Sequence, residues 1–169
     1  MTREIETEAL AAYRRYIEVR GRIVAQRRSW EELADFFTED AVFIDPAWGR
    51  VEGRDNIREF MRASMQGLED WSFPELWTTV DGHRVVTMWE QRIGPAADGR
   101  KNTQPGISVL YYAGDGLFCY EFDQLNMAHV LEDLRAMKWR PSGAFHAPPA
   151  EPVRDWSLPP AWRHLETEA

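Results

Sequence analysis

Two aspartates have the residue type and the setting that acid–base chemistry requires. Asp45 ends the apolar run 41–45, directly before Pro46, and Asp123 lies within the apolar run 117–125. A carboxyl group in an apolar cavity is desolvated, which raises its pKa toward neutrality and lets it take up and release protons. Two such groups a few ångströms apart would also separate each other's titrations. The pair therefore predicts a proton-transfer site.

Each aspartate also has an ordinary structural interpretation. An aspartate before a proline often only shapes a turn, and Asp123 could pair with an arginine or support the start of the next helix. The sequence leaves both interpretations open for Asp45 and for Asp123.

Alternation along 117–125 predicts which side chains share a face with Asp123. Successive side chains of a strand point to opposite faces, so one face should carry Cys119, Glu121, Asp123 and Leu125. The opposite face should carry Phe118, Tyr120, Phe122 and Gln124.

The first third of the chain predicts helices. Apolar side chains recur at helical spacing through 4–27, which indicates a long first helix. Ser29 and Glu32 have the spacing of a capping box, in which each satisfies a free backbone donor of the other before a short second helix. Asp55 is placed to cap a third helix.

Strands follow, beginning with a short one before the third helix. Residues 41–45 predict a strand that stops at Pro46, which has no amide hydrogen, and Gly49 and Gly53 bracket a brief return segment. Further on, four β-rich runs are predicted as strands, at 71–80, 83–93, 103–112 and 117–125. Asp81-Gly82 joins the first two and 113–116 joins the last two, and both are turn sequences, so we expect two hairpins. Hairpins make a sheet largely antiparallel.

The end of the chain predicts a closing helix and a tail. Asn126 can cap a helix that reaches about Met137, with its buried set expected at Val130, Leu131 and Leu134. We expect residues 1–140 to form one domain, and the proline-rich 141–169 to be a tail that packs on this domain or on a partner subunit through its aromatic side chains, Phe145, Trp156 and Trp162.

Composition excludes several classes of function. The formal net charge of −8 repels polyphosphate, so we expect no nucleic-acid partner. There is no membrane-length apolar run, the charged start lacks a secretory core, and the single Cys119 cannot form an internal disulfide, so a soluble cytoplasmic protein is expected. Four scattered histidines, without a glycine-rich loop or a nucleophile elbow, predict no metal and no cofactor.

Helices first and strands afterwards indicate an α+β fold. The stretch 36–46, followed by Gly53-Arg54 and by Ile57 and Phe60, resembles the shared signature of ketosteroid isomerases and SnoaL-like proteins of the nuclear-transport-factor-2-like superfamily. The resemblance covers about 30–65, and the order of later elements extends it to about 137. It implies a cone-like, barrel-shaped fold in which a curved, mainly antiparallel sheet wraps around the N-terminal helices and encloses an apolar pocket.

The resemblance also implies roles for the two aspartates. In ketosteroid isomerases the aspartate before the proline is the general base, and Asp45 matches it. In limonene epoxide hydrolases and SnoaL-like cyclases the acid/base aspartate lies on the last strand, and Asp123 within 120–126 matches it. The face with Asp123 and Glu121 would then line the pocket, and the opposite aromatic face would suit a partner subunit.

The sequence departs from both enzyme patterns. The epoxide hydrolases carry an arginine and an aspartate two residues apart on a middle strand, where this chain has Trp89 and Gln91. The isomerases need a tyrosine and a protonated carboxyl group; Tyr16 resembles the tyrosine but lies about one helical turn too far from Asp45, and Ser108 stands near the carboxyl position. A standard enzyme of either kind is therefore not expected.

The remaining candidates would bind the ligand. Trp89 and Gln91 are expected to face inward, where they would orient a planar ligand or simply pack in the core. Trp48 lies in a turn and would close the pocket mouth. The predicted binding residues are Tyr16, Phe43, Trp48, Trp89, Gln91 and Glu121, beside the predicted catalytic Asp45 and Asp123.

Two classes of function fit these expectations. The first is a cofactor-independent acid–base enzyme that isomerises, dehydrates, cyclises or hydrates a hydrophobic cyclic or polycyclic small molecule. The second is a non-catalytic binding module for a lipid-like or polycyclic ligand. With Phe118, Tyr120 and Phe122 on one outer face, a homodimer is expected in either case.

Overall fold

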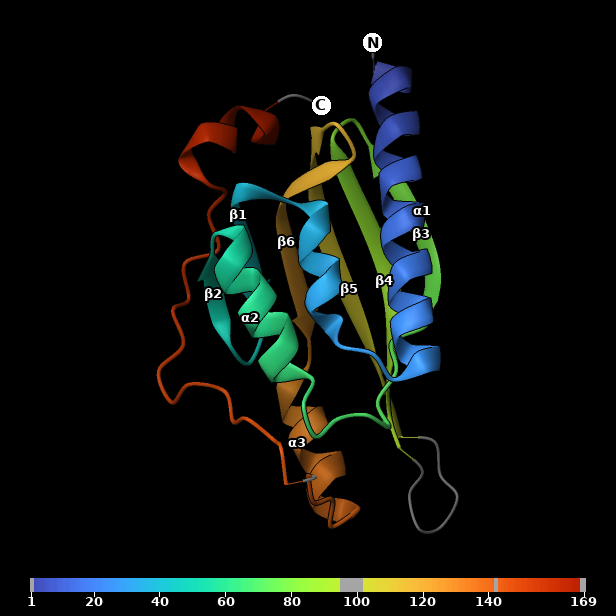
Figure 1. Cartoon of the computed structure of the whole chain (residues 1–169), viewed down its shortest axis with the longest axis vertical. Coiled ribbons are helices and arrows are strands. Elements are labelled where there is room, and N and C mark those ends of the chain that lie inside the picture. The colour runs from blue at the N-terminus through green and yellow to red at the C-terminus, as the bar shows by residue number, and fades with distance from the viewer. Residues whose placement is uncertain (1, 95–101, 142, 168–169) are drawn as a thin grey trace.

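The structure is a computed structural model that describes residues 2–94, 102–141 and 143–167 (Figure 1). Its helices are α1 (Thr2–Gln26), α2 (Arg54–Ser64) and α3 (Met127–Ala136), with the 3-10 helices η1 (Trp30–Phe36) and η2 (Pro160–Glu166). Its strands are β1 (Phe37–Asp45), β2 (Gly49–Glu52), β3 (Glu75–Asp81), β4 (Arg84–Ile93), β5 (Asn102–Gly114) and β6 (Leu117–Leu125). No helix in this described part of the chain is long and apolar enough to cross a membrane.

The described strands form a six-stranded sheet in the order β2-β1-β6-β5-β4-β3. Strands β1 and β6 run parallel, and every other neighbouring pair is antiparallel. The predicted α+β class with a mainly antiparallel sheet is therefore confirmed. The expected barrel shape is wrong, because the sheet stays open with β2 and β3 at its edges.

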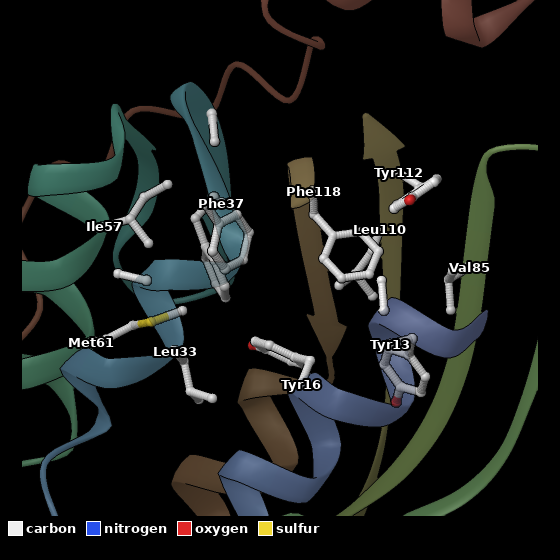
Figure 2. Packing of buried hydrophobic residues seen from close by; sticks show 14 of the residues in the cluster. Tyr13, Tyr16, Leu33, Phe37, Ile57, Met61, Val85, Leu110, Tyr112 and Phe118 are labelled. Carbon is white, nitrogen blue, oxygen red and sulfur yellow. The ribbon is translucent and has the colours of Figure 1, made fainter. Parts of the chain in front are cut away.

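Helices α1, η1 and α2 cover one face of the sheet (Figure 1). Between them and the sheet lies a core in which Tyr13 of α1, Phe37, Ile57, Leu110 and Phe118 are almost fully buried (Figure 2). Burial of each such side chain stabilises the fold by roughly 1.5–3 kcal/mol. This core fixes the position of α1 against β5 and β6.

At two helix starts the structure differs from the predicted cap. Ser29 caps η1, but its hydroxyl accepts from the Glu31 amide at 3.4 Å, and Glu32 pairs with Arg28 instead of completing a capping box. A 3-10 helix is too tightly wound for the reciprocal arrangement of an α-helical start. Helix α2 is capped by Gly53 with φ 84°, not by Asp55, which lies in the first turn, where the helix dipole favours its charge.

The first hairpin turns at Asp81-Gly82 as predicted, with Gly82 at φ 56°. Its first strand, however, begins at Glu75 and not at residue 71. Residues 71–74 contact β4 only through an isolated bridge between Ser72 and Arg92 and through a hydrogen bond from the Glu90 amide to the Pro74 carbonyl, so they do not extend the strand.

The alternation predicted for β6 agrees with the structure from Tyr120 onward, and it is wrong for the residues before Tyr120. Tyr111 on β5 pairs with Tyr120, but Tyr112 pairs with Phe118, so Cys119 is an extra residue in β6. Such a bulge reverses the alternation. Phe118 is therefore in the core beneath α1, and Cys119 packs on the outer side with Tyr120.

The C-terminal residues run along the β2 edge and end beside β1 (Figure 1). Leu158 and Leu165 pack on the outer face against Tyr111 and Tyr120, and the Arg50 guanidinium donates to the Ser157 carbonyl at 2.7 Å. The predicted exposed patch of Phe118, Tyr120 and Phe122 is thus wrong, since Phe118 is internal and Tyr120 is covered by the chain's own tail.

Helix α3 begins as predicted. The Asn126 side chain accepts from the amides of Ala128 at 3.1 Å and His129 at 3.4 Å. Val130 is buried, but Leu131 is 44% exposed and does not belong to the buried set. The helix covers only the end of the sheet, which leaves one of its apolar side chains uncovered.

Candidate functional site

A cavity of about 260 Å³ lies between the inner face of the sheet and the helices. It brings together every side chain that the sequence singled out, namely Tyr16, Phe43, Asp45, Trp48, Trp89, Gln91, Glu121 and Asp123. There are two further cavities. The one of about 200 Å³ has a single acidic side chain, Glu69, in its lining, and the one of about 290 Å³ has none. The chemistry of paired carboxyl groups therefore belongs to the first cavity.

The parallel register of β1 and β6 brings the two aspartates to the same level. Phe43 pairs with Glu121 and Ile44 with Phe122, so Asp45 and Asp123 occupy the next position on each strand. Neighbouring strands lie about 4.8 Å apart, and both aspartates line the cavity. Two carboxyl groups in this arrangement influence each other's ionisation.

A chain of hydrogen bonds orients Asp123. The Ser108 hydroxyl donates to Asp123 Oδ1 at 2.5 Å, and Trp89 Nε1 donates to Ser108 Oγ at 2.8 Å. The Trp89 ring reaches Ser108 by crossing the backbone of Gly106, where an added Cβ would lie 2.3 Å from the ring. Trp89 and Gln91 face inward as predicted, but the Trp89 N–H is already used within the protein.

Glu121 is buried, 2% exposed, and accepts a hydrogen bond from the Tyr16 hydroxyl at 3.1 Å. Burial raises the pKa of Glu121 well above its usual value, and the negative charge of Asp123 raises it further. Burial, followed by the charge of Glu121, likewise raises the pKa of Tyr16. In both groups burial therefore favours the protonated form over the charged one.

Asp123, like Glu121, has a raised pKa. Burial raises the pKa of Asp123 to about 7, with the hydrogen bond from Ser108 opposing this effect and the charge of Asp45 adding to it. A carboxyl group with this pKa is divided between its acid and base forms at neutral pH, which is the condition for efficient proton transfer.

Asp45 combines the two interpretations that the sequence left open. Its Oδ1 accepts from the amides of Ala47 at 2.7 Å and Trp48 at 2.8 Å, so it does shape the turn after β1. Burial nevertheless raises its pKa against the influence of these two amides, and the side chain lines the cavity.

Sequence reasoning missed Arg20 and undervalued Ser108. Arg20 lies one helical turn beyond Tyr16, lines the cavity, and donates to the Phe73 carbonyl at 3.0 Å. Its positive charge lowers the pKa of both Glu121 and Asp123. The four-residue spacing from Tyr16 was the available signal, since it places both side chains on one helix face. Tyr16 itself bonds to Glu121 and not to an aspartate.

In the described ranges, no group of three or more histidine, cysteine, aspartate or glutamate side chains is arranged to hold a metal ion. The polar groups that line the cavity are carboxyl, hydroxyl, amide, indole, guanidinium and imidazole groups.

Comparison with known proteins assigns the family. Residues 13–121, more than half of the chain, match the family model of the SnoaL-like domain, and the chain belongs to this family. No curated protein sequence matches the chain. The matched range includes α1 with Tyr16, both strands of the β1–β6 pair as far as Glu121, and the strands that carry Trp89 and Ser108.

Solved structures share the fold at low sequence identity. A candidate SnoaL-like polyketide cyclase from Jannaschia sp. CCS1 is 17% identical with a TM-score of 0.59, over 75% of this chain and 91% of that one. A limonene-epoxide-hydrolase-like epoxide hydrolase from M. tuberculosis is 17% identical with a TM-score of 0.58, over 79% and 93%. TerC, crystallised with polyporic acid, is 19% identical with a TM-score of 0.55, over 75% and 95%. These similarities establish the fold.

Proposed function

We propose that this protein is a cofactor-independent acid–base enzyme that acts on a hydrophobic cyclic or polycyclic small molecule. The observation that carries the proposal is the position of Asp123 in the cavity, with its pKa raised to about 7, beside Glu121, whose pKa burial also raises. The reaction is an isomerisation, dehydration, cyclisation or hydration, because each of these needs a proton to be removed at one atom and delivered at another.

Asp123 is the group that exchanges the proton. As a carboxylate it takes a proton from a C–H or O–H group of the ligand, and as an acid it returns that proton to another atom. Asp45, at the same level on β1, is the second carboxyl group of the pair and binds or relays the proton. Ser108 holds Asp123 in place, and the bonded pair of Tyr16 and Glu121 closes the polar end of the cavity.

The ligand is assigned as hydrophobic because most of the cavity lining is apolar. Four aromatic side chains, Phe43, Trp48, Phe60 and Phe73, line it together with Met61. Aromatic rings pack against flat hydrocarbon surfaces. The structural relatives include proteins named for polyketide cyclisation and for epoxide hydrolysis, and one crystallised with polyporic acid, which supports a small organic ligand here.

A carrier of a lipid-like or polycyclic ligand is the second candidate. One observation favours it: Asp45 already has a structural task in the turn after β1, so its presence in the cavity does not require catalysis. A carrier needs an apolar cavity and no proton-transfer group at a working pKa.

The base-promoted ring opening of 5-nitrobenzisoxazole separates the two candidates. In this probe a base removes the ring C–H proton, the N–O bond breaks, and a coloured cyanonitrophenolate is released. The wild-type protein should catalyse the reaction with a pH midpoint near 7, and Asp123→Asn should lower the rate by about 100-fold or more. Binding of the probe without turnover in the wild-type protein would favour the carrier.

We further propose that 1–140 form the SnoaL-like domain and that the tail contributes to the ligand site. Phe145, His146 and Pro148 line the cavity, and Phe145 packs on Trp139 with ring centroids 5.9 Å apart. A homodimer in the cytoplasm completes the proposal. Its interface would be the part of the outer face beyond the tail, where Trp77 and Ile107 are 47% and 42% exposed.

A further inference from the structure

Two buried polar atoms on the cavity wall have no hydrogen-bond partner within the described residues. They are Gln91 Oε1 and Trp71 Nε1, on side chains whose residues are 6% and 9% exposed. Trp89 and Tyr16 on the same wall differ, because Trp89 donates to Ser108 and Tyr16 donates to Glu121. An unpaired buried acceptor or donor is unfavourable, so such atoms are rare in folded proteins.

Trp71 and Gln91 are neighbours across a strand pair. Ser72 bridges Arg92 through bonds of 3.1 and 2.8 Å, which places Trp71 opposite Ile93 and diagonal to Gln91. Diagonal neighbours in an antiparallel pair lie about 7–8 Å apart on one face. Both residues line the cavity, so the donor and the acceptor share one end of it.

This end is separate from the carboxyl groups. Asp123 pairs with Ser108, and Ser108 pairs with Thr87, while Gln91 lies four residues farther along β4. That offset amounts to about 13 Å along the strand. A ligand that reaches both ends therefore carries two polar groups with an apolar body between them.

We propose that Gln91 and Trp71 form a second polar subsite, which binds one hydroxyl group of the ligand at the end remote from Asp123. A hydroxyl group both donates and accepts, so it satisfies the Gln91 carbonyl oxygen and the Trp71 indole N–H at once. This inference deepens the proposed function and rests on the cavity being a ligand site. It does not depend on Asp123 transferring a proton.

The test compares two probes of the same shape. 4-Hydroxybiphenyl carries one terminal hydroxyl group and biphenyl carries none, and isothermal titration calorimetry gives the affinity for each. The wild-type protein should bind the hydroxylated probe about tenfold more tightly, as expected for one well-formed pair of hydrogen bonds. Gln91→Leu and Trp71→Phe should each remove most of this preference while still binding biphenyl.

Three controls make the result specific. Gln124→Leu, on the exposed outer side of β6, should keep the full preference. Asp123→Asn should also keep it, because the carboxyl group lies at the other end. Circular dichroism checks folding, and Gln91→Met replaces Gln91→Leu if that variant does not fold.

The experiment distinguishes a failure of the subsite from a failure of the proposed function. Equal affinity for the two probes in the wild-type protein, or a preference that persists in both the Gln91 and the Trp71 variants, would overturn the subsite and leave the acid–base proposal standing. Failure of both probes to bind the wild-type protein would overturn the subsite and the assignment of the cavity as a site for hydrophobic ligands.

Discussion

The Tyr16 hydroxyl on α1 donates to Glu121 on β6 at 3.1 Å, and this bond joins residues 105 positions apart in the sequence. It connects the longest helix to the strand that carries Asp123. Because burial raises the pKa of both Glu121 and Asp123, the bond fixes one of two neighbouring carboxyl groups that influence each other's ionisation. The positions of α1 and of the site are therefore coupled.

Replacing Tyr16 should destabilise the protein more than replacing its neighbour. Tyr16→Phe leaves a buried Glu121 oxygen without its donor, so the free energy of unfolding should fall by about 1–3 kcal/mol in urea titrations. Tyr13→Phe is the matched control, since Thr87, to which Tyr13 donates at 2.9 Å, keeps contacts with Thr78 and the Trp77 carbonyl. An equal loss in both variants would argue against a special role for the Tyr16 bond.

Ser108 should tune the pKa of Asp123. Its hydrogen bond lowers the pKa of Asp123 against the effect of burial, so Ser108→Ala should move that pKa above about 7. The pH midpoint of 5-nitrobenzisoxazole turnover should shift to higher pH by about one unit, which corresponds to one hydrogen bond of about 1.4 kcal/mol. Ser108→Thr keeps the hydroxyl and should restore the original midpoint; the same midpoint in all three proteins would exclude this role.

The stability of the protein should fall as pH rises from about 4 to about 7. The unfolded chain ionises Asp123 near the ordinary aspartate pKa of 3.8, whereas the folded protein keeps it protonated until about 7, so the folded state binds more protons in this range. Stability from this group is therefore complete below the unfolded pKa and is lost as pH rises through the folded one. Urea unfolding of wild type and Asp123→Asn at several pH values measures the effect, and the variant should show a shallower decline.

The proposed dimer depends on outer-face side chains. Trp77, Met88 and Ile107 lie in one register row across β3, β4 and β5, and Trp77 and Ile107 are the most exposed of them. Light scattering at micromolar concentration should give a dimer mass for the wild-type protein and a monomer mass for Ile107→Glu, because a charge at the centre of an apolar interface is desolvated. A wild-type monomer at this concentration would refute the dimer.

Local sequence patterns predicted most of the helices and strands. Pro46 ends β1, the Asp81-Gly82 turn makes a hairpin, and Asn126 caps α3, and each of these features depends on one or two neighbouring residues. Asp45 and Asp123 both reach the cavity because the ends of β1 and β6, from Val42 and Tyr120 onward, keep regular alternation. These parts of the fold follow from rules of short range.

Features that depend on contacts between distant segments were beyond the sequence. The bulge at Cys119 arises from the pairing of β6 with β5, and it moves Phe118 from the outer face to the core. The Trp89 ring can reach Ser108 only because Gly106 stands opposite it on β5. The pairing of the Tyr16 hydroxyl with the Glu121 carboxyl group likewise depends on the distance between α1 and β6. No periodicity within either segment determines that distance.

The ionisation of Asp123 is the central claim, and NMR titration of the carboxyl carbons of labelled protein measures it most directly. The account predicts a midpoint near 7 for Asp123, and a pKa above the usual range of the side chain for both Glu121 and Asp45. Asp123→Asn and Glu121→Gln assign the two buried signals. Midpoints near about 3.9 for both aspartates and about 4.3 for Glu121, the pKa values of the free side chains, would show that none of the three is desolvated and would contradict the acid–base function.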